Sequence, residues 1–305
     1  MLPRVTAIRY VTPLREGGSL PGLMEADNLG TYVVKYAGAG QGRKALVAEV
    51  ITGSLARTCG LAVPDLVAVD LDPALAGGEP DQEIQDLLRA SAGLNLGVDF
   101  LSGAVDFDAA SAVDGALAGR IIWLDALTSN ADRSWRNPNM LFWRDALYLI
   151  DHGATLTYQH RWEAADAAVS RRYDISDHAL VGCAPLIDAA DADLAGLITT
   201  EALEAAVAAV PDDWLPPEPG LDRPDLIRQA HVRQLTRRLA GRESWLSGIR
   251  ETLGRPGLPR REPARTGRPS WLARSPRRTA DGDPADWGAA GRGPAGGPAG
   301  GGAGS

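Results

Sequence analysis

Hydrophobic and polar residues alternate or form short apolar runs in the first 72 residues, which predicts β-strands there. The expected strands are Val5–Val11, Leu23–Ala26, Thr31–Tyr36 and Leu66–Leu71, with a glycine-containing turn, Thr12–Leu20, after the first. Lys44–Cys59 instead repeats apolar residues at helical spacing and is followed by Gly60, a common helix stop. This part of the chain therefore predicts a small sheet with one helix.

Helical spacing dominates after residue 80. The expected helices are Asp81–Ala90, Ala109–Leu127, Asp193–Val210 and a helix-like stretch from Arg223 to Leu253. A β-hairpin interrupts them, with Met140–Trp143 and Leu147–Ile150 as strands around an Arg144–Ala146 turn. Strands before residue 80 and helices after it indicate an α+β fold, without an internal repeat.

Polar residues gather at the open ends of this hairpin. Asp132, Asn137 and Asn139 lie in the loop before it, and Asp151 follows its second strand in an Asp-His-Gly sequence. Phosphoryl transfer needs such a set: a carboxylate for the acceptor's proton, an amide oxygen for one metal ion, and a second carboxylate for the metal that bridges the ATP phosphates. The alternative is a polar loop between a helix and a hairpin, with Asp151 as an ordinary strand-end carboxylate.

Lys35 is unusual because this chain avoids lysine. Only Lys35 and Lys44 are lysines among the 31 basic residues. Contact with the α- and β-phosphates of ATP suits a compact ammonium better than a planar guanidinium. Glu49, near the middle of the first expected helix, is the expected partner of Lys35. The alternatives are a lysine retained by chance and a solvated glutamate on a helix surface.

These motifs resemble a known family. The pair formed by NADRSWRNPNML and LYLIDHGATL is similar to the H-R-D-x-x-x-x-N and D-F-G motifs of protein kinases, and most similar to the bacterial HipA-like kinase-domain family. More distantly it resembles phosphatidylinositol kinases. The resemblance implies a two-lobed protein-kinase-like fold: an ATP-binding, β-rich N-terminal lobe (1–72), a larger helical C-terminal lobe (73–253) and a disordered tail (254–305).

The resemblance also implies a role for each motif. Mg-ATP is expected between the lobes, with Lys35 on the phosphates and Glu49 holding Lys35. Asp151 is expected to bind the bridging Mg²⁺, and Asp132 to accept or orient the acceptor's proton. For the second metal ion, Asn137 has the usual spacing after Asp132, whereas Asn139 directly precedes the strand as the kinase asparagine does. Asn139 is preferred and Asn137 stays open.

Further residues follow from the same resemblance. Gly17 and Gly18 are expected near the phosphates by position, although REGGS lacks the G-x-G-x-x-G pattern. Val69, Asp70 and Leu71 are expected in the linker whose backbone meets the adenine.

Two side chains have more open roles. Arg133 is expected to contact phosphate charge or to form a structural salt bridge. His152, which replaces the phenylalanine of D-F-G, is expected to pack or hydrogen-bond locally.

The acceptor is not evident from the sequence. The HipA-like resemblance implies a serine or threonine of a protein, and the looser kinase analogy implies a lipid or small-molecule hydroxyl. A nucleotide-binding pseudokinase that serves as a regulatory or interaction module is a further alternative. The weak Gly-rich loop and the missing His of His-Arg-Asp favour that alternative, whereas Lys35, Asp132 and Asp151 favour an enzyme.

Composition limits the remaining possibilities. The 305 residues are 45% hydrophobic, which suffices for one large core or two lobes. No apolar stretch is long enough to span a membrane and no secretory leader precedes the first strand, so a cytoplasmic protein is expected. Cys59 and Cys183 are expected as buried thiols, and the four histidines lack the spacing of metal ligands.

Charge is distributed unevenly. From Arg223 onward the chain has sixteen arginines and seven acidic residues, a charge of +9. Because the net charge of the whole chain is −8, residues 1–222 carry a charge of −17. An acidic folded part argues against nucleic acid as its partner. The Arg-, Gly-, Pro- and Ala-rich segment from Gly254 onward has the composition of a disordered tail. Transient contact of this tail with nucleic acid or a membrane surface stays open.

Overall fold

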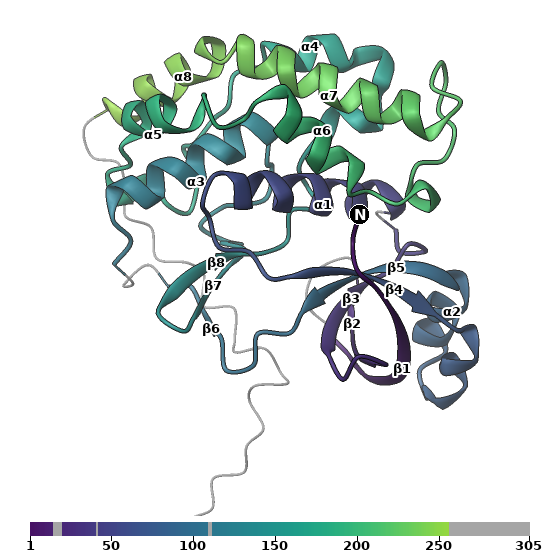
Figure 1. Ribbon diagram of the computed structural model, residues 1–305. Coiled ribbons are helices and arrows are strands. Elements are labelled where there is room, and N and C mark those ends of the chain that lie inside the picture. The colour runs from purple at the N-terminus through teal and green to yellow at the C-terminus, as the bar shows by residue number, and fades with distance from the viewer. Residues whose placement is uncertain (15–19, 41, 109–111, 256–305) are drawn as a thin grey trace, which may run out of the picture.

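The computed structural model describes residues 1–14, 20–40, 42–108 and 112–255. Five strands form a closed barrel in the order β1-β2-β3-β5-β4, and three form a second sheet in the order β6-β7-β8 (Figure 1). The strands are β1 (Arg4–Pro13), β2 (Gly22–Ala26), β3 (Thr31–Lys35), β4 (Leu66–Leu71), β5 (Gly93–Asp99), β6 (Val105–Asp106), β7 (Met140–Trp143) and β8 (Ala146–Leu149).

Most helices stack in a body on one side of the two sheets, whereas α2 lies against the barrel (Figure 1). The α-helices are α1 (Gly42–Thr58), α2 (Gln82–Ala90), α3 (Gly115–Thr128), α4 (Ala165–Val169), α5 (Ile187–Leu194), α6 (Thr200–Ala208), α7 (Pro224–Ala240) and α8 (Glu243–Leu253). Short 3-10 helices are Pro73–Gly78, Thr157–His160, Trp162–Ala164, Val181–Cys183 and Asp212–Trp214. Within the described ranges, no helix is both long and apolar enough to cross a bilayer.

Side-chain alternation along β3 decides where its lysine points. Tyr32 and Val34 are buried inside the barrel, so Val33 and Lys35 face outward. Residues of the other strands and of α2 complete the barrel core: Val5, Ala7, Met24, Ala26, Val67, Val69, Leu71, Ile84 and Leu88. The outward direction of Lys35 is what allows it to meet α1.

The barrel extends beyond residue 72, where the sequence suggested that the first lobe ends. Strand β5 pairs with β3, placing Leu96 opposite Lys35, and with β4, placing Asn95 opposite Val69. The expected boundary therefore falls between two strands of one barrel. Local patterns could not show this, because β5 joins its neighbours through pairings across many residues.

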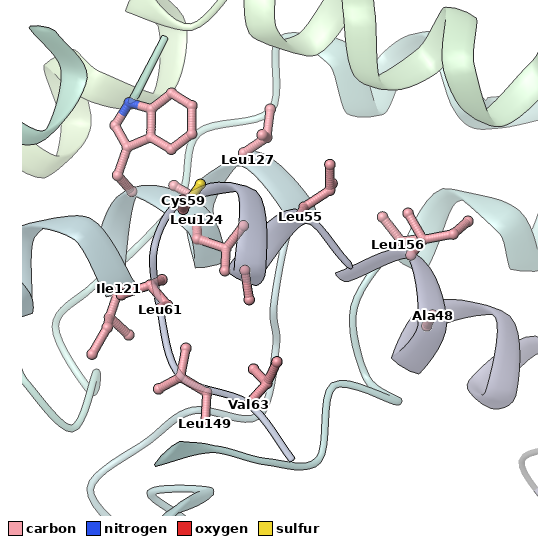
Figure 2. Close-up of a cluster of buried hydrophobic side chains, with 14 of the residues drawn as sticks. Ala48, Leu55, Cys59, Leu61, Val63, Ile121, Leu124, Leu127, Leu149 and Leu156 are labelled. Atoms are coloured by element: carbon pink, nitrogen blue, oxygen red, sulfur yellow. The ribbon is translucent and has the colours of Figure 1, made fainter. Parts of the chain in front are cut away.

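Helix α1 belongs to the main hydrophobic core rather than to the surface of the barrel. Ten of its residues are buried, on all of its faces. Figure 2 shows Leu55 of α1 and Cys59, which directly follows this helix, gathered with Leu124 and Leu127 of α3 and with Leu149 of β8. Because this helix is buried on every side, its position is set by packing with the helical body.

Some predicted helices differ from those found. The stretch expected as one helix, Asp193–Val210, is divided between α5 and α6, because the Thr199 hydroxyl accepts from Ala202 N at 3.2 Å and starts a new helix. The helix-like stretch after Arg223 similarly divides into α7 and α8 at Gly241. Helix α3 begins at Gly115 rather than at Ala109, which lies outside the described residues.

A buried arginine ties α7 to the end of α3. Arg238 is 1% exposed and donates hydrogen bonds to carbonyls that include Ala126 O, at 2.6 Å, and Ala168 O, at 2.7 Å. Burial lowers the pKa of Arg238 to about 10, so it stays protonated at neutral pH. The carbonyl ends of α3 and α4 thus share one cation, and the loop that follows α3 starts from a fixed point.

Arg238→Met should lower the free energy of unfolding by about 2–4 kcal/mol, since it leaves buried carbonyls of two helices without a donor. Arg237→Met is the matched control: the neighbouring side chain is 52% exposed and pairs with an exposed carboxylate, that of Asp166. Its cost should stay within about 1 kcal/mol. Urea unfolding of both variants measures the difference, and equal costs would contradict the capping role.

Candidate functional site

Three separate segments converge on one ammonium group. Lys35 at the end of β3 forms an ion pair with Glu49 of α1 and donates to Asp151 Oδ1, after β8, at 2.7 Å. The Lys35 side chain is 14% exposed and that of Glu49 only 3%, whereas that of Asp151 is 48% exposed. The lysine–glutamate pair expected from the sequence is therefore present, and the strand-end carboxylate completes a triad.

The charges of this triad stabilise one another. Burial alone would raise the pKa of Glu49, but the Lys35 ammonium and then His152 outweigh it and hold the pKa well below its usual range. Burial alone would lower the pKa of Lys35, yet Glu49 and Asp151 raise it above its usual value. Both groups are thus charged throughout the neutral pH range.

The triad opens into a pocket with about 300 Å³ of empty space, in part open to solvent. Asp151 adopts a left-handed backbone conformation (φ 54°) at the point where β8 ends, and its carboxylate lies at this pocket. The other lining residues are Lys35, Tyr36, Ala39, Gly42, Ala45, Leu46, Glu49 and Gly153. An exposed carboxylate beside a buried cation suits a pocket that receives phosphates and a metal ion.

The loop before β7 surrounds Asp132 with amides. Asn137 Nδ2 donates to Asp132 Oδ2 at 2.8 Å, and Asn139 Nδ2 donates to the same oxygen at 3.2 Å. The Asn139 carbonyl also accepts from Ile150 N at 3.0 Å, which places the backbone of Asn139 beside the residue that precedes Asp151. The structure therefore brings all four predicted polar residues into two adjacent segments.

Two side chains with open roles are now placed. Arg133 is buried and its Nε donates to Asp125 Oδ2 at 2.7 Å, so the salt bridge is the role that the structure shows. His152 is buried, with Nδ1 3.6 Å from Glu49 Oε2, and its carbonyl accepts from the Thr155 hydroxyl at 2.8 Å. His152 is thus held locally, as expected.

Residues 69–71, which were expected to contact the adenine, lie within a strand of the barrel. Val69 and Leu71 are buried inside the barrel, and Asp70 forms an exposed ion pair with Arg4. Strand β4 pairs with β5 through Leu71 and with β1 through Asp70, so the backbones of Val69 and Asp70 lie between two strands and that of Leu71 is paired on one side. The prediction for residues 69–71 is therefore corrected. Gly17 and Gly18 lie outside the described residues.

Sequence reasoning missed the groups beneath the loop. Asp125 of α3 and His178 are both buried and hydrogen-bonded to each other at 3.0 Å. One signal for Asp125 was available: it is an acidic residue within the apolar helix that ends just before Asn130. For His178, more than 50 positions downstream of Asp125, no local pattern pointed to this place.

The fold is similar to that of a solved kinase structure. The chain is similar to the structure of a Helicobacter pylori proinflammatory kinase, CtkA, with a TM-score of 0.53 and 12% identity, over 85% of this chain and all of that one. The structure of the Golgi casein kinase aligns with 15% identity over 85% of this chain and 74% of that one, at a TM-score of 0.43. No curated protein matches the chain.

The family follows from a family model. The HipA-like kinase model matches residues 7–247, so the chain belongs to the HipA-like kinase family, as the sequence motifs indicated.

Glu49→Gln should lower the free energy of unfolding at pH 7 by about 1.5–3 kcal/mol, because Lys35 loses a buried ionic partner. The pKa of Glu49 is depressed in the folded state, so its contribution is present above about pH 4.3 and fades as the pH falls below it. The pKa of Lys35 is raised, so the pair stays intact up to about pH 10.

Urea unfolding at pH 7 and pH 3 measures this difference. Glu25→Gln, which removes an exposed partner of Arg9, is the control and should change stability much less at pH 7. A Glu49→Gln variant whose deficit is the same at both pH values would contradict the buried-pair interpretation.

Proposed function

We propose that this protein is an ATP-dependent phosphotransferase that transfers the γ-phosphate of Mg-ATP to a hydroxyl group, with a protein serine or threonine as the favoured acceptor. One observation carries the proposal: Lys35 contacts Glu49 and Asp151 at once, so a phosphate-binding cation and a metal-binding carboxylate share one pocket. Membership of the HipA-like kinase family supports a kinase-type reaction.

The barrel and the helical body act as the two lobes of this enzyme, with the nucleotide between them. Because residues 69–71 are paired within the barrel, the segment that leaves β5, residues 100–104, takes the place of the linker beside the adenine. Phe100 N donates to Thr31 O at 3.0 Å and Trp143 Nε1 donates to Ser102 O at 3.0 Å. The first residue of the segment is thus tied to the barrel, and its middle to the β7–β8 hairpin.

The donor set suits Mg²⁺. Carboxylate and amide oxygens are hard ligands, and Mg²⁺ takes few of them from protein when phosphates supply the rest. Asp151 would hold the bridging ion, and Asn139 is favoured over Asn137 for a second one because its backbone adjoins that of Ile150, next to Asp151. When bound, the metal offsets the charge that develops on the transferred phosphoryl group. Lys35, steadied by Glu49, would contact the α- and β-phosphates.

Asp132 would orient the acceptor hydroxyl and take its proton. The carboxylate is half-buried, and both neighbouring asparagines donate to Oδ2. Two fixed donors hold the carboxylate in one orientation, which is the requirement for a positioning base. The family favours a protein hydroxyl as acceptor over a lipid or a small molecule.

Asp151→Asn should remove most of the rise in melting temperature that Mg-ATP produces, because ligand stabilisation lasts only while binding does. Asp145→Asn is the matched control, since Asp145 lies in the turn at the other end of the same hairpin and also has a positive φ of 65°. Thermal unfolding with and without Mg-ATP compares them. A full melting shift in Asp151→Asn would refute the metal assignment.

Asp132→Ala should reduce phosphate transfer by about 10²-fold or more while ATP affinity stays within a few-fold of wild type, since the acceptor base acts mainly in the transition state. The assay uses γ-labelled ATP, Mg²⁺ and a cell extract, with label scored on protein and on extracted lipid. Asp193→Ala, at a 68% exposed side chain, is the control and should transfer normally. Wild-type transfer by Asp132→Ala would show that NADRSWRNPN is a structural loop.

A further inference from the structure

A single buried carboxylate lies beneath the candidate catalytic loop. Asp125 Oδ1 accepts from Asn130 Nδ2 at 2.8 Å, and Oδ2 accepts from Arg133 Nε at 2.7 Å and from His178 Nε2 at 3.0 Å. Burial alone would raise the pKa of Asp125, but Arg133 and then His178 hold it well below its usual range. Asp125 is therefore ionised, and both of its oxygens are used.

The first branch of this network leads to Asp132. Asn130, held by Asp125, accepts from Asp132 N on Oδ1 at 3.0 Å. The Asn130 carbonyl in turn accepts from the Tyr173 hydroxyl at 2.9 Å. The backbone of the proposed base is therefore two hydrogen bonds away from Asp125.

The second branch leads to the metal side of the site. Arg133 Nη1 donates to the Asn139 carbonyl at 2.6 Å, and the same carbonyl accepts from Ile150 N. One guanidinium thus joins Asp125 to the preferred metal-binding asparagine, and through it to the residue before Asp151. The two branches thus reach the backbones of Asp132 and Asn139 and the residue that precedes Asp151.

His178 supports the network as a neutral ring. Leu180 N donates to His178 Nδ1 at 3.1 Å, so Nδ1 is an acceptor and the proton lies on Nε2, which faces Asp125. The charge balance beneath the loop thus rests on Asp125 and Arg133, whose side chains are completely inaccessible to solvent.

We propose that Asp125 is a positioning residue for phosphoryl transfer, which holds Asp132 and Asn139 in register through Asn130 and Arg133; this rests on the proposed function. A buried ion pair contributes little net stability, because desolvation offsets its attraction. Alignment of reacting groups, in contrast, is sensitive to displacements of about 1 Å. Each branch ends on the backbone of a site residue, which suits alignment.

Asp125→Asn tests this role. Asparagine has one acceptor oxygen where aspartate has two, so either amide orientation breaks one branch. The matched control is Asp191→Asn, in α5. Asp191 Oδ1 likewise accepts a hydrogen bond from a ring N–H, that of Trp123, at 2.8 Å, and one from Arg242 Nε at 2.9 Å. Trp123 lies on α3, the helix that also carries Asp125. That cluster has no hydrogen bond to the loop among the described residues.

The measurement is kcat and KM for ATP in the transfer assay, at a temperature where circular dichroism shows each variant folded. Asp125→Asn should lower kcat by about 10- to 100-fold with KM for ATP within a few-fold, whereas Asp191→Asn should keep the wild-type kcat. A kcat for Asp125→Asn equal to that of wild type, or reduced no more than by Asp191→Asn, would overturn the proposal.

Two further arms keep the test decisive. Should Asp125→Asn fail to fold, Asn130→Ala breaks the branch to Asp132 without leaving a buried charge, and an unchanged kcat there would overturn the proposal. Wild-type protein that transfers no phosphate would refute the proposed function instead.

In that case the second branch is tested by Mn²⁺ binding in the presence of a non-hydrolysable ATP analogue, measured by electron paramagnetic resonance. Asp125→Asn should weaken that binding and Asp191→Asn should not; equal binding in all three proteins would overturn the positioning role.

Discussion

A buried ammonium must have anionic partners, and the position of Lys35 makes that requirement the organising constraint of this molecule. The barrel supplies the lysine, the helical body supplies Glu49, and the end of the β7–β8 hairpin supplies Asp151. Neither Lys35 nor Glu49 can move far without leaving a buried charge unpaired. The two ion pairs of Lys35, with Glu49 and with Asp151, therefore align three parts of the fold around one pocket.

Glu49 can serve this purpose because α1 is packed on all sides within the core. Beyond its apolar packing, α1 is tied to the segment that follows Asp-His-Gly: Lys44 Nζ donates to Gln159 O at 2.8 Å, and the Thr52 and Thr155 hydroxyls are 2.7 Å apart. Lys44 also forms an ion pair with Glu218 at 2.7 Å. The helix that carries the glutamate is consequently hydrogen-bonded to the segment that follows Asp151.

Polar groups deep in the helical body follow one pattern. Arg238 holds the carbonyl ends of two helices, and Asp125 holds the loop that begins where one of them ends. Both groups are costly to bury, and each contacts backbone or side-chain atoms of the segment from α3 to β7. Part of this cost is therefore spent where the positions of Asp132 and Asn139 are decided.

Strands β1 to β4, helices α1 and α2, and the β7–β8 hairpin are predictable from the sequence, because local periodicity and turn residues encode them. The sequence also singled out Lys35, Glu49, Asp132 and Asp151, since their chemistry is visible in residue type and spacing. Only the tertiary structure shows that β5 closes the barrel, that Val69 and Asp70 are paired on both sides, and that Arg133 contacts Asp125. Pairing between segments far apart in sequence depends on packing and desolvation, which no local pattern records.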